Sequence, residues 1–190
     1  MTSVNLISRL RSRLNKEEAV QLSHQLLAEK FSLRELIDVT FFEQVQVGFR
    51  ASWILECVVL SQPQLLQNEL DYFVQKFPQV TNRSVRRHFS KLLMWLLEAA
   101  KRDENFAQKF WQHDLEPVLT ACFDWLIDPQ ERVAVKVQCM DCIAALSQKY
   151  PWAIDELLPT VEYLQHDATP AMQVRARRLL FALRNLNFGI

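Results

Sequence analysis

The sequence predicts an all-α protein built from repeated pairs of helices, and three observations support this prediction. Gly48 and Gly189 are the only glycines among 190 residues, whereas average usage is about 7% and sheets, hairpins and phosphate loops need glycine. Prolines fall between apolar segments with helical spacing, where they begin or end helices. The pattern apolar–acid–aromatic–apolar occurs three times, as LDYF (70–73), FDWL (123–126) and VEYL (161–164).

Length, charge and hydropathy set the class of protein. A chain of 190 residues can bury a core without disulfide or metal staples, and we expect one domain spanning 1–190. Its 22 basic and 22 acidic residues cancel, so no global field attracts the protein to nucleic acid or to a membrane. No apolar run approaches the ~20 residues that a membrane helix needs. Four cysteines without a framework spacing indicate reduced thiols and a cytoplasmic location.

The first part of the chain, residues 1–45, is predicted to form an N-terminal helical cap. Its three helices are expected at 3–14, 16–30 and 33–42. Ser32 and Glu35 have the spacing of a capping box, in which a hydroxyl and a carboxylate each accept a backbone N–H at the helix start. The third helix is therefore expected to begin directly after Ser32.

The rest of the chain, residues 46–186, is predicted to alternate A helices with B helices. The A helices are expected at 46–61, 83–101, 131–148 and 171–186. The B helices are expected at 64–77, 114–127 and 153–166, and 103–113 is an insertion. Pro117 and Pro159 are expected in or near the first turn of their B helices, where a missing amide hydrogen costs little. Each acid–aromatic pair falls in one B helix.

The starts of the A helices share a second pattern, an apolar residue followed by a cation. It occurs at 49–50, 85–86, 135–136 and 174–175. Once the insertion is removed, the cations recur about every 40 residues, and a two-helix unit of that period is the signature of HEAT or armadillo solenoids. With polar caps such as Asn82 and Asp167, these starts resemble the HEAT pattern. The resemblance implies a right-handed α-α superhelix of HEAT-like repeats across 46–186.

Two longer runs carry a further resemblance. RASWILE (50–56) and ACFDWLI (121–127) are similar to a family of short bacterial HEAT-like proteins. Some members carry the label adenylosuccinate lyase, but that enzyme has a much longer chain and a Ser-rich, Gly-containing signature loop. Nothing in this sequence matches that loop. The resemblance therefore implies a fold and no reaction.

No metal or cofactor site is predicted. Cys139 and Cys142 have CxxC spacing, but they lie in the middle of an expected helix, without a second cysteine pair or a nearby histidine to complete a zinc site. We interpret both thiols as core residues, because free cysteine packs as a small hydrophobe. The four histidines are spread over four different helices or junctions.

The recurring cations have two interpretations. They are Arg50, Arg86, Lys136 and Arg175, with Arg87 beside the second of them. In HEAT-type repeats such a cation usually pairs with an acid of the neighbouring repeat and sets the stacking, so we predict a structural ladder. The alternative is a stripe that binds a polyanion.

The acid–aromatic pairs are the candidate partner-binding residues. They are Asp71, Tyr72, Asp124, Trp125, Glu162 and Tyr163. Repetition would place one pair per repeat on the concave inner face, where aromatic side chains provide contact area at low entropic cost. In the alternative interpretation, the aromatic residues seal the seams between repeats and the acids pair with the cation ladder.

The predicted function is a non-catalytic scaffold that binds a protein or peptide on its concave face, as a monomer or weak dimer. The alternative is a HEAT-like DNA-binding protein or an enzyme resembling DNA alkylation repair glycosylases, which hold damaged DNA in a basic groove with aromatic residues and an aspartate at the lesion. That resemblance implies a lesion site at Asp124 with Trp125, or at Trp111 with Asp114, and phosphate contacts from Arg86, Arg87 and Lys91. The zero net charge and the acids of the B helices oppose DNA binding, so we expect nucleic acid to bind only weakly.

Overall fold

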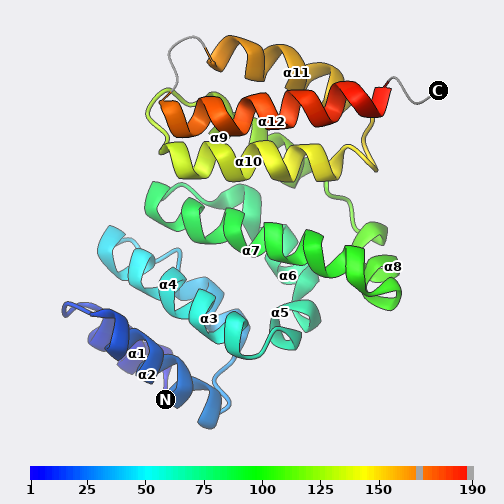
Figure 1. Ribbon diagram of the computed structural model, residues 1–190. Helices are drawn as coiled ribbons and strands as arrows, with labels where there is room; N and C mark the ends of the chain where they lie inside the picture. Colours follow the sequence, from blue (N-terminus) through cyan, green and yellow to red (C-terminus); the bar gives the residue numbers. More distant parts are fainter. Residues whose placement is uncertain (166–168, 188–190) are drawn as a thin grey trace. The chain divides into compact units, whose positions relative to one another are not determined.

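The computed structural model describes residues 1–165 and 169–187. In those ranges it contains twelve α-helices, one short 3-10 turn and no β-strand (Figure 1), so the all-α prediction is confirmed. The chain comprises two compact units, Met1–Leu92 and Leu93–Ile190. The boundary falls inside the long helix α7, Arg83–Arg102.

The first unit is organised around α4. Its elements are α1 (Ser3–Leu10), α2 (Lys16–Ala28), α3 (Leu33–Val39), α4 (Val45–Ser61), α5 (Gln64–Asn68), α6 (Leu70–Lys76), the 3-10 turn η1 (Phe77–Gln79) and the first half of α7. Helix α4 packs against α1, α2 and α3. On α7, the fully buried ring of Phe89 stacks on Phe73 at a centroid distance of 5.2 Å and meets Phe41 edge-on at 6.0 Å. These aromatic contacts join α6, α7 and the turn that follows α3 in one core.

The first predicted B helix, 64–77, is interrupted in the structure. It divides at Glu69, whose φ of −105° and ψ of 23° depart from helical values. Asn68 precedes the break, and asparagine competes with helix hydrogen bonding through its side chain. The carboxylate of Glu69 forms an ion pair with Arg34 of α3. The break therefore coincides with a contact between the cap and the first repeat.

The second unit is organised around α10. Its elements are the second half of α7, α8 (Glu104–Gln112), α9 (Glu116–Ile127), α10 (Val133–Leu146), α11 (Trp152–Leu164) and α12 (Pro170–Asn187). Helix α10 packs against α9, α11 and α12. Cys139 and Cys142 of α10 are free thiols with no exposed surface, and burial raises the pKa of Cys142. Their interpretation as core residues is confirmed.

The insertion 103–113 forms helix α8. Asp103 caps it by accepting hydrogen bonds from the backbone N–H groups of Asn105 and Phe106. Phe106 and Phe110 turn inward and are buried. The insertion thus adds an amphipathic helix to the second unit.

Of the two prolines placed by sequence in B helices, one is where it was expected. Pro117 lies in the first turn of α9, as predicted. The predicted position of Pro159 in or near a first turn is wrong, because α11 begins at Trp152 and Pro159 lies in the interior of that helix. The carbonyl of Asp155 loses its helical partner there. Both residues are exposed, so water can satisfy that carbonyl.

Gly48 is buried where α4 approaches the end of α3. A Cβ atom at this position would lie 2.6 Å from the backbone oxygen of Thr40 and 3.3 Å from Nδ2 of Asn82. Glycine inside a helix normally costs about 0.5–1 kcal/mol relative to alanine. At Gly48 we expect alanine to be less stable than glycine, because the added methyl group would collide with the backbone of Thr40 rather than with a flexible side chain.

We therefore expect Gly48→Ala to lower the free energy of unfolding by about 1–3 kcal/mol. Denaturant unfolding measures the change. Gln46→Ala, at an exposed position of the same helix, is the matched control and should stay within about 0.5 kcal/mol of the parent. A Gly48→Ala protein at least as stable as the parent would show that α3 and α4 separate without cost.

Candidate partner-binding surfaces

The first predicted acid–aromatic pair is partly used for packing within the first unit. Tyr72 is half-buried and donates a hydrogen bond to Asp38 of α3, which raises the pKa of the phenol. The cationic groups of Arg34 and Lys76 each lie 5.3 Å from the centre of the Tyr72 ring. Asp71 beside it is exposed. Tyr72 therefore joins α3 to α6, as in the interpretation in which aromatic residues seal seams.

The second pair is divided between the core and the surface. Trp125 does not lie on a partner-binding surface, where it was predicted, because it is buried. Its side chain is only 3% exposed, so it offers a partner almost no contact area. Trp125 follows Val118 by seven residues and Cys122 by three, and both are fully buried on the inward side of α9. Asp124, one residue earlier, is exposed.

The third pair is exposed at both positions. Glu162 lies on the exposed side of α11, and the side chain of Tyr163 is 79% exposed. Of the six predicted binding residues, Asp124, Glu162 and Tyr163 therefore lie on the surface of the second unit. Neighbours that the sequence did not single out complete this surface.

Helices α9 and α11 present an acidic surface with aromatic residues. Neither helix contains a lysine or an arginine, and their exposed acids are Glu116, Asp124, Asp155, Glu156 and Glu162. Phe123 of α9 stacks on Trp152 of α11 at a centroid distance of 5.9 Å, which joins the two helices. Trp152 is 42% exposed and Ile127 is 56% exposed. We call these acids, together with Phe123, Ile127, Trp152 and Tyr163, the acidic–aromatic face.

Two of the recurring cations bind neighbouring helices. In the second unit, Nε and Nη2 of Arg175 (α12) both bond to Oδ1 of Asp141 (α10), at 2.9 and 2.6 Å. In the first unit, Nη1 of Arg50 (α4) donates to the carbonyl of Leu10 at the end of α1, at 2.8 Å. The structural ladder is thus present at Arg175. At Arg50 the partner is a helix carboxyl terminus, which also favours a cation, rather than the expected acid.

The other cations offer little surface to a polyanion. Nε of Arg86 donates to the carbonyl of Val80 at 3.2 Å, and Lys136 is buried. Of the five predicted ladder or stripe residues, only Arg87 is exposed. The arrangement favours the structural interpretation over the polyanion stripe.

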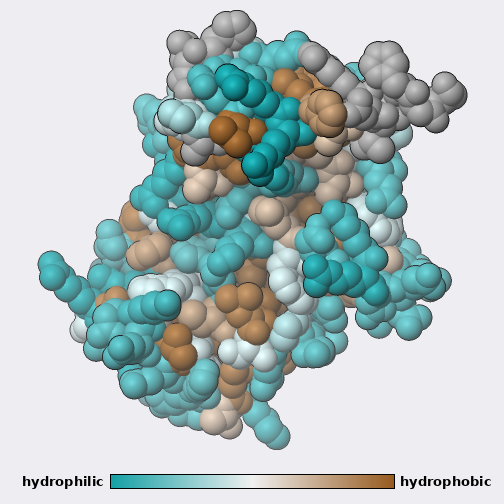
Figure 2. All heavy atoms as spheres, viewed as in Figure 1, coloured by the Kyte–Doolittle hydropathy of each residue, from teal (hydrophilic) through white to brown (hydrophobic). Residues whose placement is uncertain are grey.

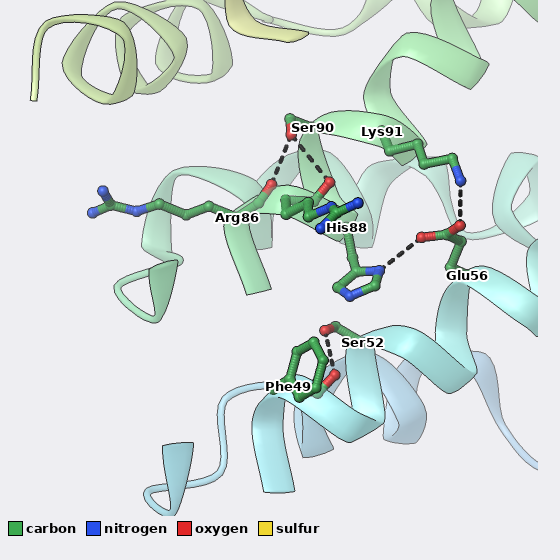
Figure 3. A network of polar contacts seen from close by, with 8 residues as sticks. Phe49, Ser52, Glu56, Arg86, His88, Ser90 and Lys91 are labelled. Atoms are coloured by element: carbon green, nitrogen blue, oxygen red, sulfur yellow. Dashed lines mark hydrogen bonds and ion pairs between the residues drawn. The ribbon is translucent and has the colours of Figure 1, made fainter. Parts of the chain in front are cut away.

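A polar network in the first unit holds α4 to α7 (Figure 3). Glu56 of α4 accepts hydrogen bonds from Lys91 and, at 2.7 Å, from Nδ1 of His88, both on α7. Burial alone would raise the pKa of Glu56, but these two bonds outweigh it and lower the pKa to about 2. Nε2 of His88 is buried without a hydrogen-bond partner in the described part of the chain, and its ring lies 5.7 Å from that of Phe49. Lys91, expected as a phosphate contact in the DNA alternative, is engaged by Glu56.

The alternative lesion site at Trp111 and Asp114 is also used for packing. Oδ1 of Asp114 accepts the backbone N–H of Glu116 at 3.0 Å and the hydroxyl of Tyr150 at 3.1 Å. The carbonyl of Trp111 accepts a hydrogen bond from Lys149 at 2.7 Å. Asp114 thus bonds to the first residue of α9, but the N-cap position is held by Leu115, whose side chain makes no capping hydrogen bond.

The second unit also contains a groove of about 550 Å³ that the sequence did not reveal. It is lined by residues of α7, α8, α10, α11 and α12, including Trp111 and the Asp141–Arg175 ion pair. In the described ranges, no group of three or more His, Cys, Asp or Glu side chains is placed to hold a metal ion. No helix within those ranges is long and apolar enough to cross a bilayer.

Paired helices joined by ladder contacts and short loops define an α-helical repeat protein. A HEAT repeat domain model matches residues 6–183, so the chain belongs to the HEAT repeat family. The match also covers most of the predicted cap, including α2 and α3. No match was found among curated proteins or among solved structures.

Proposed function

We propose that this HEAT repeat protein is a non-catalytic scaffold whose acidic–aromatic face binds a Lys/Arg-rich segment of a partner protein. The observation that carries the proposal is the composition of α9 and α11, which together expose five acids and contain no cation. Complementary charge steers a basic partner to this face and disfavours an acidic one.

The exposed aromatic residues add a second kind of attraction for the same partner. Cations bind over the faces of tryptophan and tyrosine rings, with about 0.5–1 kcal/mol at exposed sites. Trp152 and Tyr163 offer such faces among the carboxylates of α11. The methylene stems of lysine and arginine can also cover apolar surface such as Ile127. Acids and aromatic rings together therefore favour a basic peptide over a simple cation.

The acidic–aromatic face should repel DNA rather than bind it. Duplex DNA carries one negative charge per ~1.7 Å of its axis, and exposed carboxylates repel it. Asp124, the aspartate of one alternative lesion site, lies among these acids, and its neighbour Trp125 is buried. We therefore expect no release of modified base from alkylated duplex DNA.

The proposal is tested with a fluorescein-labelled Lys/Arg-rich peptide by fluorescence anisotropy at low and moderate salt. We expect saturable, salt-sensitive binding that the double variant Asp124→Asn, Glu162→Gln weakens about tenfold, because two carboxylates lose their charge. Tyr163→Ala should weaken it about threefold through the lost cation–π contact.

The matched control is the double variant Glu17→Gln, Glu43→Gln, which removes two exposed acids of the first unit and changes net charge equally. It should bind the peptide like the parent. If the two double variants lose affinity for the peptide equally, the loss comes from the change in net charge alone, and the proposal is contradicted. Base release from alkylated DNA that depends on Asp124 or Asp114 would make the protein an enzyme instead.

A further inference from the structure

The first unit carries a short basic segment where α1 ends and the chain turns into α2. This segment is RLRSRLNK (9–16), and no acid occurs among the first sixteen residues of the chain. Nη1 of Arg50, on α4, lies at the same turn and donates to the carbonyls of Leu10 and Arg11 at 2.8 and 3.3 Å. Figure 2 shows hydrophilic side chains around this turn, which lies at the left of the view (Figure 1). The four cations of the segment are all exposed, and they are Arg9, Arg11, Arg13 and Lys16.

The basic segment has no carboxylate partner in the described part of the chain. None of its four cations forms an ion pair with an acid there. Arg9 donates instead to the amide oxygen of Gln25 at 3.0 Å. Of the two acids that follow the segment, Glu18 is already engaged, because its carboxylate accepts the backbone N–H of Asn15 at 2.7 Å. The segment therefore presents positive charge that ion pairs within the described residues do not neutralise.

The same chain carries a surface of the opposite charge, the acidic–aromatic face. This face exposes five acids, and its helices α9 and α11 contain no lysine or arginine. Phe123 stacks on Trp152 between the two helices. Asp124 directly follows the first of these rings, and Glu156 lies one helical turn after the second. Guanidinium groups pair with carboxylates through two N–H groups and also stack on aromatic rings. Because three of the four cations of the basic segment are arginines, the segment matches the face in charge and in side-chain type.

We propose that the acidic–aromatic face binds the basic segment of a second copy of this chain. The inference rests on the proposed function, because it identifies the Lys/Arg-rich segment that the face takes. A second copy fits better than nucleic acid, because the zero net charge gives no general attraction for a polyanion, whereas the acids that match the segment belong to the same chain.

The segment and the face belong to different units of the chain. Two copies that exchange segments form a closed dimer, and head-to-tail repetition of the same contact forms a longer chain of copies. In both cases the contact is made by exposed charges. The association is therefore weak and sensitive to salt.

Sedimentation velocity of the full chain at low salt, over a range of protein concentrations, tests the proposal. We expect the average mass to rise above that of the monomer with concentration, and to return to it at about 0.5 M salt, where exposed charges are screened. The segment variant Arg11→Glu, Arg13→Glu and the face variant Asp124→Lys, Glu156→Lys should each weaken association about tenfold or more, because like charges then oppose each other. All four side chains are exposed, so both variants should fold, which circular dichroism checks.

Each charge-reversed variant has a matched control with the same net charge. Lys30→Glu, Lys109→Glu matches the segment variant, and Glu43→Lys, Glu104→Lys matches the face variant. These four side chains are exposed and lie outside both the basic segment and the acidic–aromatic face. Both controls should associate like the parent. If a control loses association as much as the variant it matches, net charge alone drives association and the proposal is wrong.

The fluorescein-labelled Lys/Arg-rich peptide separates this proposal from the function on which it rests. The peptide should dissociate the copies, because it occupies the same face. If the peptide binds the acidic–aromatic face but the parent sediments as a monomer at every concentration, the proposed function stands and a second copy is not the partner. If the parent associates and the face variant associates equally well, the basic segment binds elsewhere and the proposal is overturned.

Discussion

Replacing Trp125 with alanine is expected to lower the free energy of unfolding by about 3–5 kcal/mol, the usual range for removing a large buried aromatic side chain. Trp125 is 3% exposed, and its helix, α9, packs against α10. The cavity left by the indole would lie inside the second unit, where the surrounding helices relax only partly. Denaturant unfolding, followed by circular dichroism, measures the loss.

The matched control is Tyr163→Ala, which changes the exposed aromatic residue of the third pair. It should shift the unfolding free energy by no more than about 0.5 kcal/mol, while weakening capture of the basic peptide. If Trp125→Ala keeps the stability of the parent but binds the peptide more weakly, Trp125 belongs to the binding surface and its assignment to the core is wrong.

Acid should remove the stabilisation that comes from Glu56. Its pKa in the folded protein is about 2, below the ordinary 4.5. Because the folded pKa is the lower one, the contribution is complete above pH 4.5 and is lost as pH falls toward 2. A shift of this size corresponds to at most about 3 kcal/mol.

The variant Glu56→Gln isolates this effect from that of the other carboxylates. It should be less stable than the parent at neutral pH, and the difference should shrink between about pH 5 and pH 2. Glu98→Gln is the matched control, because Glu98 also pairs with a lysine and has a lowered pKa but is exposed. Its pH dependence should follow the parent closely. If the difference in unfolding free energy between the parent and Glu56→Gln stays constant across this range, the network contributes no pH-dependent stability and the prediction is wrong.

The local pattern of the sequence determined the helices and the nature of the repeat. Scarce glycine, prolines at segment ends and helical spacing of apolar residues act within a few neighbouring residues, so they can be read without knowledge of the fold. The same reasoning placed Cys139 and Cys142 in the core, because both lie in the middle of an apolar helix. It also located the acids of the three acid–aromatic pairs, Asp71, Asp124 and Glu162, and all three are exposed.

Tertiary structure decided what each aromatic residue of the repeated pattern does. Tyr72, Trp125 and Tyr163 follow an acid in the same local pattern, yet one bonds to α3, one is buried and one is exposed. Local spacing fixes only the direction of a side chain from its own helix. Whether another helix covers that direction depends on residues distant in the chain.

The same physical reason accounts for the features that the sequence did not reveal. Glu56 meets His88 and Lys91 across two helices, and Asp141 meets Arg175 across two others. The groove requires stripes from α7, α10 and α12, each of which looks ordinary alone. The sequence by itself determined the helices and which residues share a side of each one. Only packing between helices determined which sides became core, ion pair, binding face or groove.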